Sequence, residues 1–148
     1  MGLTTLGELA AFVGSPPGVP DDVYPASTPL ELDRPLVVDA AAERAFAEWF
    51  ALGNEALLQL ISLHAATDTS DIQLWPEHFD LATTINQVNF GASPGDAEHD
   101  EPYLYVGPFE QRSGPFWNES FGASVSRVEV PDVAAAVDFF STGLDLTR

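Results

Sequence analysis

The spacing of apolar residues changes from a helical to a strand-like period near residue 70, and this change constrains the fold most. Before it, residues 39–66 place apolar side chains on one stripe at helical spacing, namely Phe46, Phe50, Leu57 and Ile61. After the polar turn Thr67–Ser70, apolar residues alternate with polar ones from Ile72 to Ile85, which is the period of a strand. The sequence therefore predicts a long helix at 39–66, with Asp39 as its N-cap, followed by strands and loops over residues 71–130.

The flanking segments contain their own start and stop signals. Residues 1–14 suit a short helix, because Thr5 and Glu8 have the spacing of a capping box and a glycine follows at position 14. Residues 15–38 contain six prolines and predict an extended connector. Residues 131–143 predict a C-terminal helix with Pro131 in its first turn and Gly143 as its stop.

Shorter signals refine this outline. Further strands are expected at Gln87–Phe90, Tyr103–Val106 and Ser124–Val130, with a turn at 91–96. Pro76 interrupts the first alternating run and predicts a bend there. In the long helix, Gly53 predicts a kink or a break, because glycine weakens a helix interior. The pattern favours a single domain over residues 1–148 of the α+β class, in which a small, mostly antiparallel sheet packs against the long helix and the C-terminal helix.

The net charge of the chain limits the classes of partner that it can bind. There are 23 acidic residues against five arginines and no lysine, and the formal net charge is -18. Such a surface repels phosphate backbones and anionic membranes, so we expect neither nucleic-acid nor membrane binding. A basic protein partner, self-association or cation binding remains compatible with it. No export signal, no cysteine and no apolar run of about 18 residues is present, so we expect a cytoplasmic protein.

Polar side chains recur on one face of two expected strands. Because strand side chains alternate, His78 and Asp80 point to one side, and Glu101, Tyr103 and Tyr105 share a side of a later segment. If these segments are neighbours, the two polar sets meet. The candidate metal ligands are His78, Asp80 and Glu101. The candidate ligand-binding residues are Trp75, Asn89, Asp96, Tyr103, Tyr105 and Asn118.

One imidazole and two or three carboxylates suit a divalent metal ion, which could polarise a carbonyl group or activate a water molecule. A simpler interpretation remains open, in which Asp80 binds backbone amides at a turn and His78 binds a neighbouring carboxylate. The pair Glu77-His78 has no second histidine four residues away, so the zinc-protease motif is absent.

A serine motif gives a third hypothesis. The segment Gly91–Gly95 matches the letters GxSxG around Ser93. A nucleophile elbow requires a strand that runs into a helix, whereas Pro94 disfavours a helical Ser93 and the following residues are typical of a loop. A hydrolase would also need His78 or His99 as its base.

Four segments together resemble an uncharacterised family common in high-GC actinobacteria, to which no established activity is attached. They are LWPEHFDLA, NFGASPGD, EPYLYVGP and FWN, which lie between Leu74 and Asn118. The resemblance covers roughly Leu30 to the C-terminal helix. It implies no role for any of these residues. Family members often have additional strand-forming sequence near the N-terminus, where this chain has a short helix and the proline-rich segment.

Three functions follow as hypotheses. The first is a domain that binds a small molecule or a divalent metal ion in a polar pocket, either as a binding protein or as an enzyme. The second is a non-catalytic, acidic protein-interaction module. The third is a hydrolase that uses Ser93.

Overall fold

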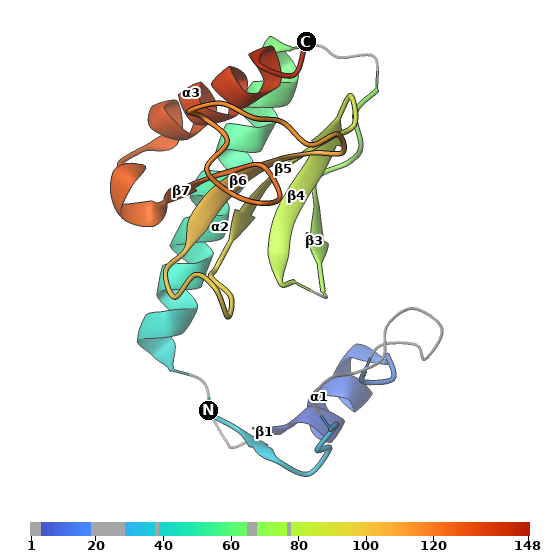
Figure 1. The fold of residues 1–148 in the computed structure, drawn as a ribbon. Coiled ribbons are helices and arrows are strands. Elements are labelled where there is room, and N and C mark those ends of the chain that lie inside the picture. Colours follow the sequence, from blue (N-terminus) through green and yellow to red (C-terminus); the bar gives the residue numbers. More distant parts are fainter. Residues whose placement is uncertain (1–3, 19–28, 38, 65–67, 77) are drawn as a thin grey trace. The chain divides into compact units, whose positions relative to one another are not determined.

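The chain divides into two compact units, Met1–Glu43 and Arg44–Arg148. The structure is a computed structural model that describes residues 4–18, 29–37, 39–64, 68–76 and 78–148 (Figure 1). The prediction of one domain over the whole chain stays a prediction. Part of the connector expected at 15–38 and the end of the long helix expected at 66 lie outside the described residues.

The first unit contains the short helix that the sequence predicts. Helix α1 spans Leu6–Val13, and Thr5 and Glu8 form the reciprocal bonds of a capping box. The helix ends at Gly14, whose φ of 71° is left-handed and therefore suits glycine. Strand β1 (Thr4–Thr5) directly precedes helix α1 and pairs with strand β2 (Pro35–Leu36) in a small antiparallel ladder. In the described part of residues 15–38, the connector therefore contains one short strand.

The long helix α2 spans Ala40–Leu63. As expected of an N-cap, the Asp39 carboxylate accepts hydrogen bonds from the backbone N–H groups of Ala41 and Ala42. Helix α2 continues through Gly53, so of the two expected features, a kink or a break into two helices, the break is wrong. Gly53 is buried, and a Cβ atom there would lie 2.6 Å from the Cβ of Ala92. The glycine therefore allows the helix to approach the sheet closely.

The second unit is built on a five-stranded antiparallel sheet with strands in chain order (Figure 1). The strands are β3 (Gln73–Trp75), β4 (Asp80–Ile85), β5 (Val88–Ser93), β6 (Tyr103–Pro108) and β7 (Ala123–Ser126). Strands β4 and β5 form a tight hairpin whose two turn residues, Asn86 and Gln87, both have positive φ. The expected turn at 91–96 begins later, since β5 continues to Ser93.

One face of the sheet is covered by helices α2 and α3, the latter spanning Val133–Asp145. Phe90 of β5 and Leu104 of β6 are fully buried in a hydrophobic core with Trp49 of α2 and Phe140 of α3. Phe90 and Phe140 pack edge to face with ring centroids 5.9 Å apart. The predicted α+β class, with a mostly antiparallel sheet against the two helices, is confirmed.

Two boundaries near the C-terminus differ from those expected. The strand predicted at Ser124–Val130 ends at Ser126, and Arg127–Glu129 form a 3₁₀ turn, η1. Helix α3 begins after Asp132, whose carboxylate accepts from the Ala135 N–H, and it continues past Gly143. A Cβ at Gly143 would lie 2.8 Å from both γ carbons of Val106. Gly143 therefore serves close packing rather than helix termination.

None of the helices in the described residues combines the length and the apolarity that crossing a membrane requires.

Candidate functional site

The face of the sheet opposite the helices contains a cavity of about 740 Å³. Strand register aligns its polar side chains, because Ser93 pairs with Tyr103, Gly91 with Tyr105 and Asn89 with Gly107. Alternation then turns Phe90, Ala92, Leu104 and Val106 toward the helices. The lining residues are His78, Asp80, Asn89, Ser93, Gly95, Asp96, Glu98, Tyr103, Tyr105, Gly107, Pro108 and Phe121.

A tyrosine and a carboxylate meet across the middle of the cavity. The Tyr105 hydroxyl donates to Oδ2 of Asp80, which belongs to a strand two positions away in the sheet. Gly91 lies on the strand between them, and a Cβ there would overlap the Tyr105 ring. Because Gly91 has no side chain, the ring can lie across β5 and reach Asp80.

Only one of the two carboxylate oxygens of Asp80 has a hydrogen-bond partner among the described residues. Asp80 is 5% exposed, and its Oδ1 atom is buried without a hydrogen-bond partner among the described residues. A buried polar group without a partner costs about 1–3 kcal/mol, and more when it is charged. This oxygen is shielded from solvent, but Asp80 lines the cavity, so a donor that enters the cavity and draws the carboxylate toward it could become the missing partner.

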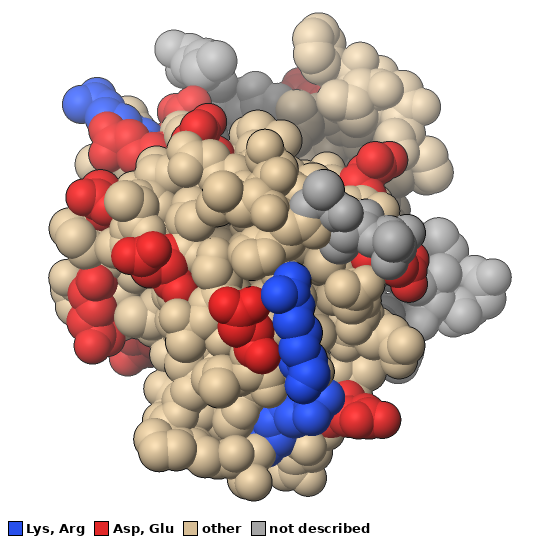
Figure 2. Space-filling model, turned by 90° about the horizontal axis from the view of Figure 1, so that it is seen from above, with Lys and Arg blue, Asp and Glu red and all other residues tan. Residues whose placement is uncertain are grey.

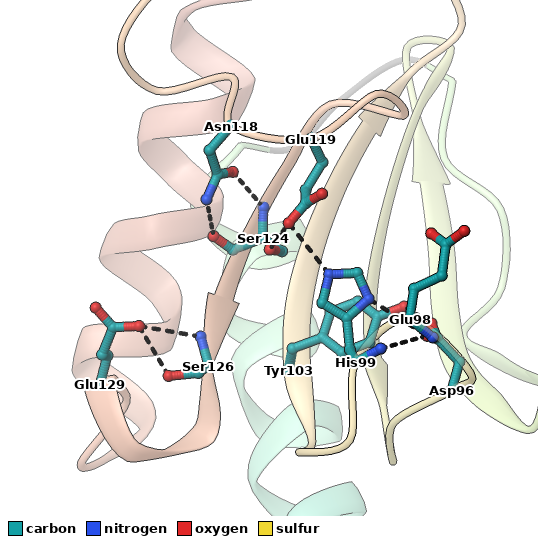
Figure 3. A network of polar contacts seen from close by, with 9 residues as sticks. All are labelled: Asp96, Glu98, His99, Tyr103, Asn118, Glu119, Ser124, Ser126 and Glu129. Carbon is teal, nitrogen blue, oxygen red and sulfur yellow. Dashed lines mark hydrogen bonds and ion pairs between the residues drawn. The ribbon is translucent and has the colours of Figure 1, made fainter.

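A second cluster links the rim of the cavity to β7 (Figure 3). The Tyr103 hydroxyl donates to Oδ2 of Asp96 over 2.6 Å. The His99 ring lies between two carboxylates, with Nδ1 at 3.3 Å from Asp96 and Nε2 at 3.1 Å from Glu119. Glu119 also accepts from the Ser124 hydroxyl over 2.8 Å. The cluster therefore connects the β5–β6 loop to the segment before β7.

These contacts shift the acidity of the groups involved. The hydrogen bond from Tyr103, followed by backbone bonds, lowers the pKa of Asp96 to about 2. The hydrogen bond from Ser124 lowers the pKa of Glu119, and the bond to Glu119 raises the pKa of His99. Burial raises the pKa of Tyr103 and of Tyr105 above the ordinary value of a phenol. Both phenols are consequently protonated donors at neutral pH.

Ser93 does not have the surroundings of an activated nucleophile. It is buried at the end of β5, its hydroxyl oxygen accepts from the Gly95 N–H over 3.2 Å, and its carbonyl accepts from the Trp49 ring over 2.7 Å. A loop follows it, as the sequence indicates. His99 forms its side-chain bonds with Asp96 and Glu119 instead. The hydrolase hypothesis gains no support from this geometry.

The expected metal ligands are separated. The predicted cluster required strands β4 and β6 to be neighbours, but they lie on either side of β5. His78 lies exposed in the turn before β4 and lines the cavity with Asp80, whereas Glu101 precedes β6 and is not a lining residue. Within the part of the chain that the structure describes, no three His, Cys, Asp or Glu side chains are arranged to bind a metal ion. His78, Asp80 and Glu101 thus do not form the predicted cluster.

The expected ligand-binding residues divide into two groups. Asn89, Asp96, Tyr103 and Tyr105 line the cavity. Trp75 lies half exposed on the edge strand β3 and is not a lining residue. Asn118 pairs with the backbone of Ser124 through its amide, at 2.9 and 3.1 Å, and orders the loop before β7.

Sequence reasoning missed three contributors, Gly91, Glu119 and Phe121. Gly91 was assigned to a turn, although its position within β5 makes room for the Tyr105 ring. Phe121 lines the cavity and Glu119 binds His99, and both come from an irregular segment. Such a segment has no periodicity, so the sequence contained no signal for the direction of either side chain.

Neither protein-family models nor curated protein sequences nor solved structures give a significant match to this chain. The resemblance to an actinobacterial family stays a prediction.

Proposed function

We propose that the second unit binds a small organic molecule in the cavity on the open face of its sheet. The observation that supports this most strongly is Asp80, a carboxylate that is 5% exposed, lines the cavity and has one oxygen without a partner among the described residues. A chain gains nothing in stability from such an oxygen. A ligand that donates to it would remove the cost.

The cavity has the size and lining of a ligand site. Its volume of about 740 Å³ is within the range of about 300–1,000 Å³ that is common for small-molecule pockets. Aromatic walls from Tyr103, Tyr105 and Phe121 combine with a few convergent polar groups. Rigid strands supply most of these groups, so the site is largely formed before a ligand binds.

A screen with a cavity-filling variant tests this proposal. Gly107 lines the cavity, and a Cβ there would meet only ordinary contacts, 3.6 Å from the Phe121 carbonyl oxygen and 3.9 Å from the Asn89 Cβ. Gly107→Leu should therefore fill the cavity and leave the sheet intact, and Gly107→Ala is its matched control. Thermal unfolding would be followed against cationic, neutral and anionic metabolites and divalent metal ions.

We expect at least one organic compound to raise the melting temperature of the native protein and of Gly107→Ala, because a ligand that binds only the folded form stabilises it by mass action. Gly107→Leu should show no such rise. If all the organic compounds leave the native protein unchanged, or stabilise Gly107→Leu equally, the cavity is not a binding site.

The acidic surface favours a second candidate, docking of a basic protein. The net charge is -18, and acidic side chains are spread over the face shown in Figure 2, where basic ones are few. Electrostatic association of this kind weakens steeply as salt is added. Binding of a basic polypeptide such as polyarginine should fall at least tenfold between about 0.05 and about 0.5 M NaCl, measured by titration calorimetry. Affinity that does not depend on salt would exclude this mode.

A further inference from the structure

We infer that the ligand of this cavity is an organic cation, an amine or guanidinium compound with apolar groups, whose N–H donors bind Asp80. This inference rests on the proposed binding function and assigns the class of its ligand. Three independent features of the lining lead to it, namely hydrogen-bond capacity, charge and aromatic content.

The hydrogen-bond capacity of the cavity is mostly acceptor capacity. The phenol protons of Tyr103 and Tyr105 are already donated to Asp96 and Asp80. Each phenol oxygen therefore offers only its lone pairs to a ligand. Asp80 adds its Oδ1 atom, which has no partner among the described residues. The Asn89 side-chain oxygen accepts from the Thr84 hydroxyl, so this side chain offers a ligand the N–H donors of its amide. A ligand that matches the Asp80 carboxylate and the two phenol oxygens is rich in N–H or O–H donors, with an acceptor for the Asn89 amide.

The charge of the lining is negative. Asp80, Asp96 and Glu98 line the cavity, and none of the five arginines does. The Asp96 carboxylate is ionised at neutral pH, since its pKa is lowered to about 2. Against these three carboxylates the lining offers only the imidazole of His78 as a basic group, so an anionic ligand would be repelled and a cation attracted.

The aromatic lining separates an organic cation from a bare metal ion. The Tyr105 ring lies 6.2 Å from the Tyr103 ring and 6.4 Å from the Phe121 ring, centroid to centroid. Ring faces bind organic cations through their quadrupole and bury apolar groups at the same time. A metal ion would instead need several oxygen or nitrogen ligands, and the described residues contain no such cluster.

A matched set of probes tests the inference. 2-Phenylethylamine, 2-phenylethanol and phenylacetate share one apolar group and differ mainly in the charge of the polar end. Each would be titrated calorimetrically into the full chain at about 0.15 M NaCl, where charges further apart than about 8 Å are screened. Arginine ethyl ester adds a guanidinium probe that is also cationic at its amine.

Two carboxylate variants separate a specific site from general attraction to an acidic protein. Asp80→Asn removes the proposed partner of the cation. Asp138→Asn changes the net charge equally on the exposed outer side of α3 and is the matched control. Tyr105→Phe is a third variant, which keeps the aromatic wall and frees the other oxygen of Asp80.

We expect at least one cationic probe to bind, and 2-phenylethanol and phenylacetate to bind at least about tenfold more weakly, as a charged hydrogen bond contributes about 1.5–3 kcal/mol. Asp80→Asn should lose the same factor of about ten, Asp138→Asn should bind as the native chain does, and Tyr105→Phe should retain cation binding. Loss of binding in Asp80→Asn with retention in Tyr105→Phe would locate the interaction at the carboxylate.

Three results would overturn the inference. The first is that no cationic probe binds. The second is that the cations bind equally well to the native chain and to Asp80→Asn. The third is that a neutral or anionic compound from the metabolite screen binds in a way that Gly107→Leu abolishes. This last result would leave the proposed binding function intact, whereas a screen without any hit would remove that function itself.

Discussion

At the scale of single residues, the site depends on a glycine that lets a tyrosine cross a strand. Tyr105 and Asp80 belong to strands β6 and β4, and the ring can span β5 because Gly91 presents no side chain there. Neighbouring strands are about 4.8 Å apart, so the ring bridges about 10 Å of sheet. The hydrogen bond to Asp80 consequently depends on residues from three strands and could not be recognised from one local sequence motif.

Gly91→Ala tests this dependence. The added methyl group overlaps the Tyr105 ring, which must move and release Asp80, so we expect the free energy of unfolding to fall by about 1–3 kcal/mol. Gly107→Ala is the control on the next strand, and it should change stability by less than about 1 kcal/mol, because its Cβ meets only ordinary contacts. Urea unfolding of both variants measures the difference. Equal stability of Gly91→Ala and Gly107→Ala would contradict the packing of the Tyr105 ring across β5 at Gly91.

The histidine cluster predicts a dependence on pH. The pKa of His99 is raised, so its contribution to stability is complete below its unfolded value of about 6.5 and is lost as the pH rises through the folded value. The pKa values of Asp96 and Glu119 are lowered, so their contributions exist above about pH 4 and are lost as the pH falls. The cluster should therefore stabilise most between about pH 4.5 and 6.5.

His99→Gln removes the central charge of the cluster. We expect it to destabilise the protein more at pH 5.5 than at pH 8.5, by an amount under about 1 kcal/mol, because partly exposed ion pairs are weak. The free energy of unfolding in urea at the two pH values gives the difference. If His99→Gln lowers the free energy of unfolding equally at the two pH values, the charge of His99 contributes no stability.

At the scale of elements, local signals located the helices well and the long-range packing poorly. The capping box of Thr5 and the N-cap Asp39 each predict a helix start from nearby residues, and both are confirmed. Gly53 and Gly143 were interpreted by their helix propensity, as a break and a stop. Both lie inside helices, because each faces a partner that is distant in sequence, Ala92 and Val106.

Gly53→Ala therefore tests packing against propensity. Alanine is better than glycine in a helix by about 1 kcal/mol, but here its methyl group would lie 2.6 Å from the Cβ of Ala92. We expect a net loss of stability of about 1–3 kcal/mol from the overpacked interface. Asn54→Ala, on the exposed side of the same helix, is the control and should be neutral or stabilising. Thermal unfolding of the two variants provides the comparison, and a more stable Gly53→Ala would contradict the close approach.

At the scale of the whole molecule, the alternation of side chains along the strands could be predicted from the sequence, whereas the order of the strands in the sheet could not. The period of two gave Tyr103 and Tyr105 a common face, and both line the same cavity as Asn89 and Asp96. Strand order depends on which ladders form, and β5 lies between the two segments that the metal hypothesis required to be neighbours. Glu101 lies before β6, which begins at Tyr103, and it does not line the cavity.

The net charge also acts on the molecule as a whole. With a charge of -18, repulsion among carboxylates opposes the compact state, and added salt screens it. We expect the urea midpoint to rise between about 0.01 and about 0.3 M NaCl, as the Debye length falls from about 30 Å toward less than 10 Å. Circular dichroism follows this transition. A midpoint that does not change with salt would show that the carboxylates are far enough apart to be neutral toward folding.

The most direct test of binding in the cavity is an NMR titration of the uniformly ¹⁵N-labelled chain with the organic compound that stabilises it most. Saturable shifts of backbone amides are predicted on the open face of β4, β5 and β6, centred on Asp80, Gly91 and Tyr105, and absent in Gly107→Leu. Shifts that are confined to the helices, or that never saturate and spread over the acidic surface, would contradict a ligand site on this sheet.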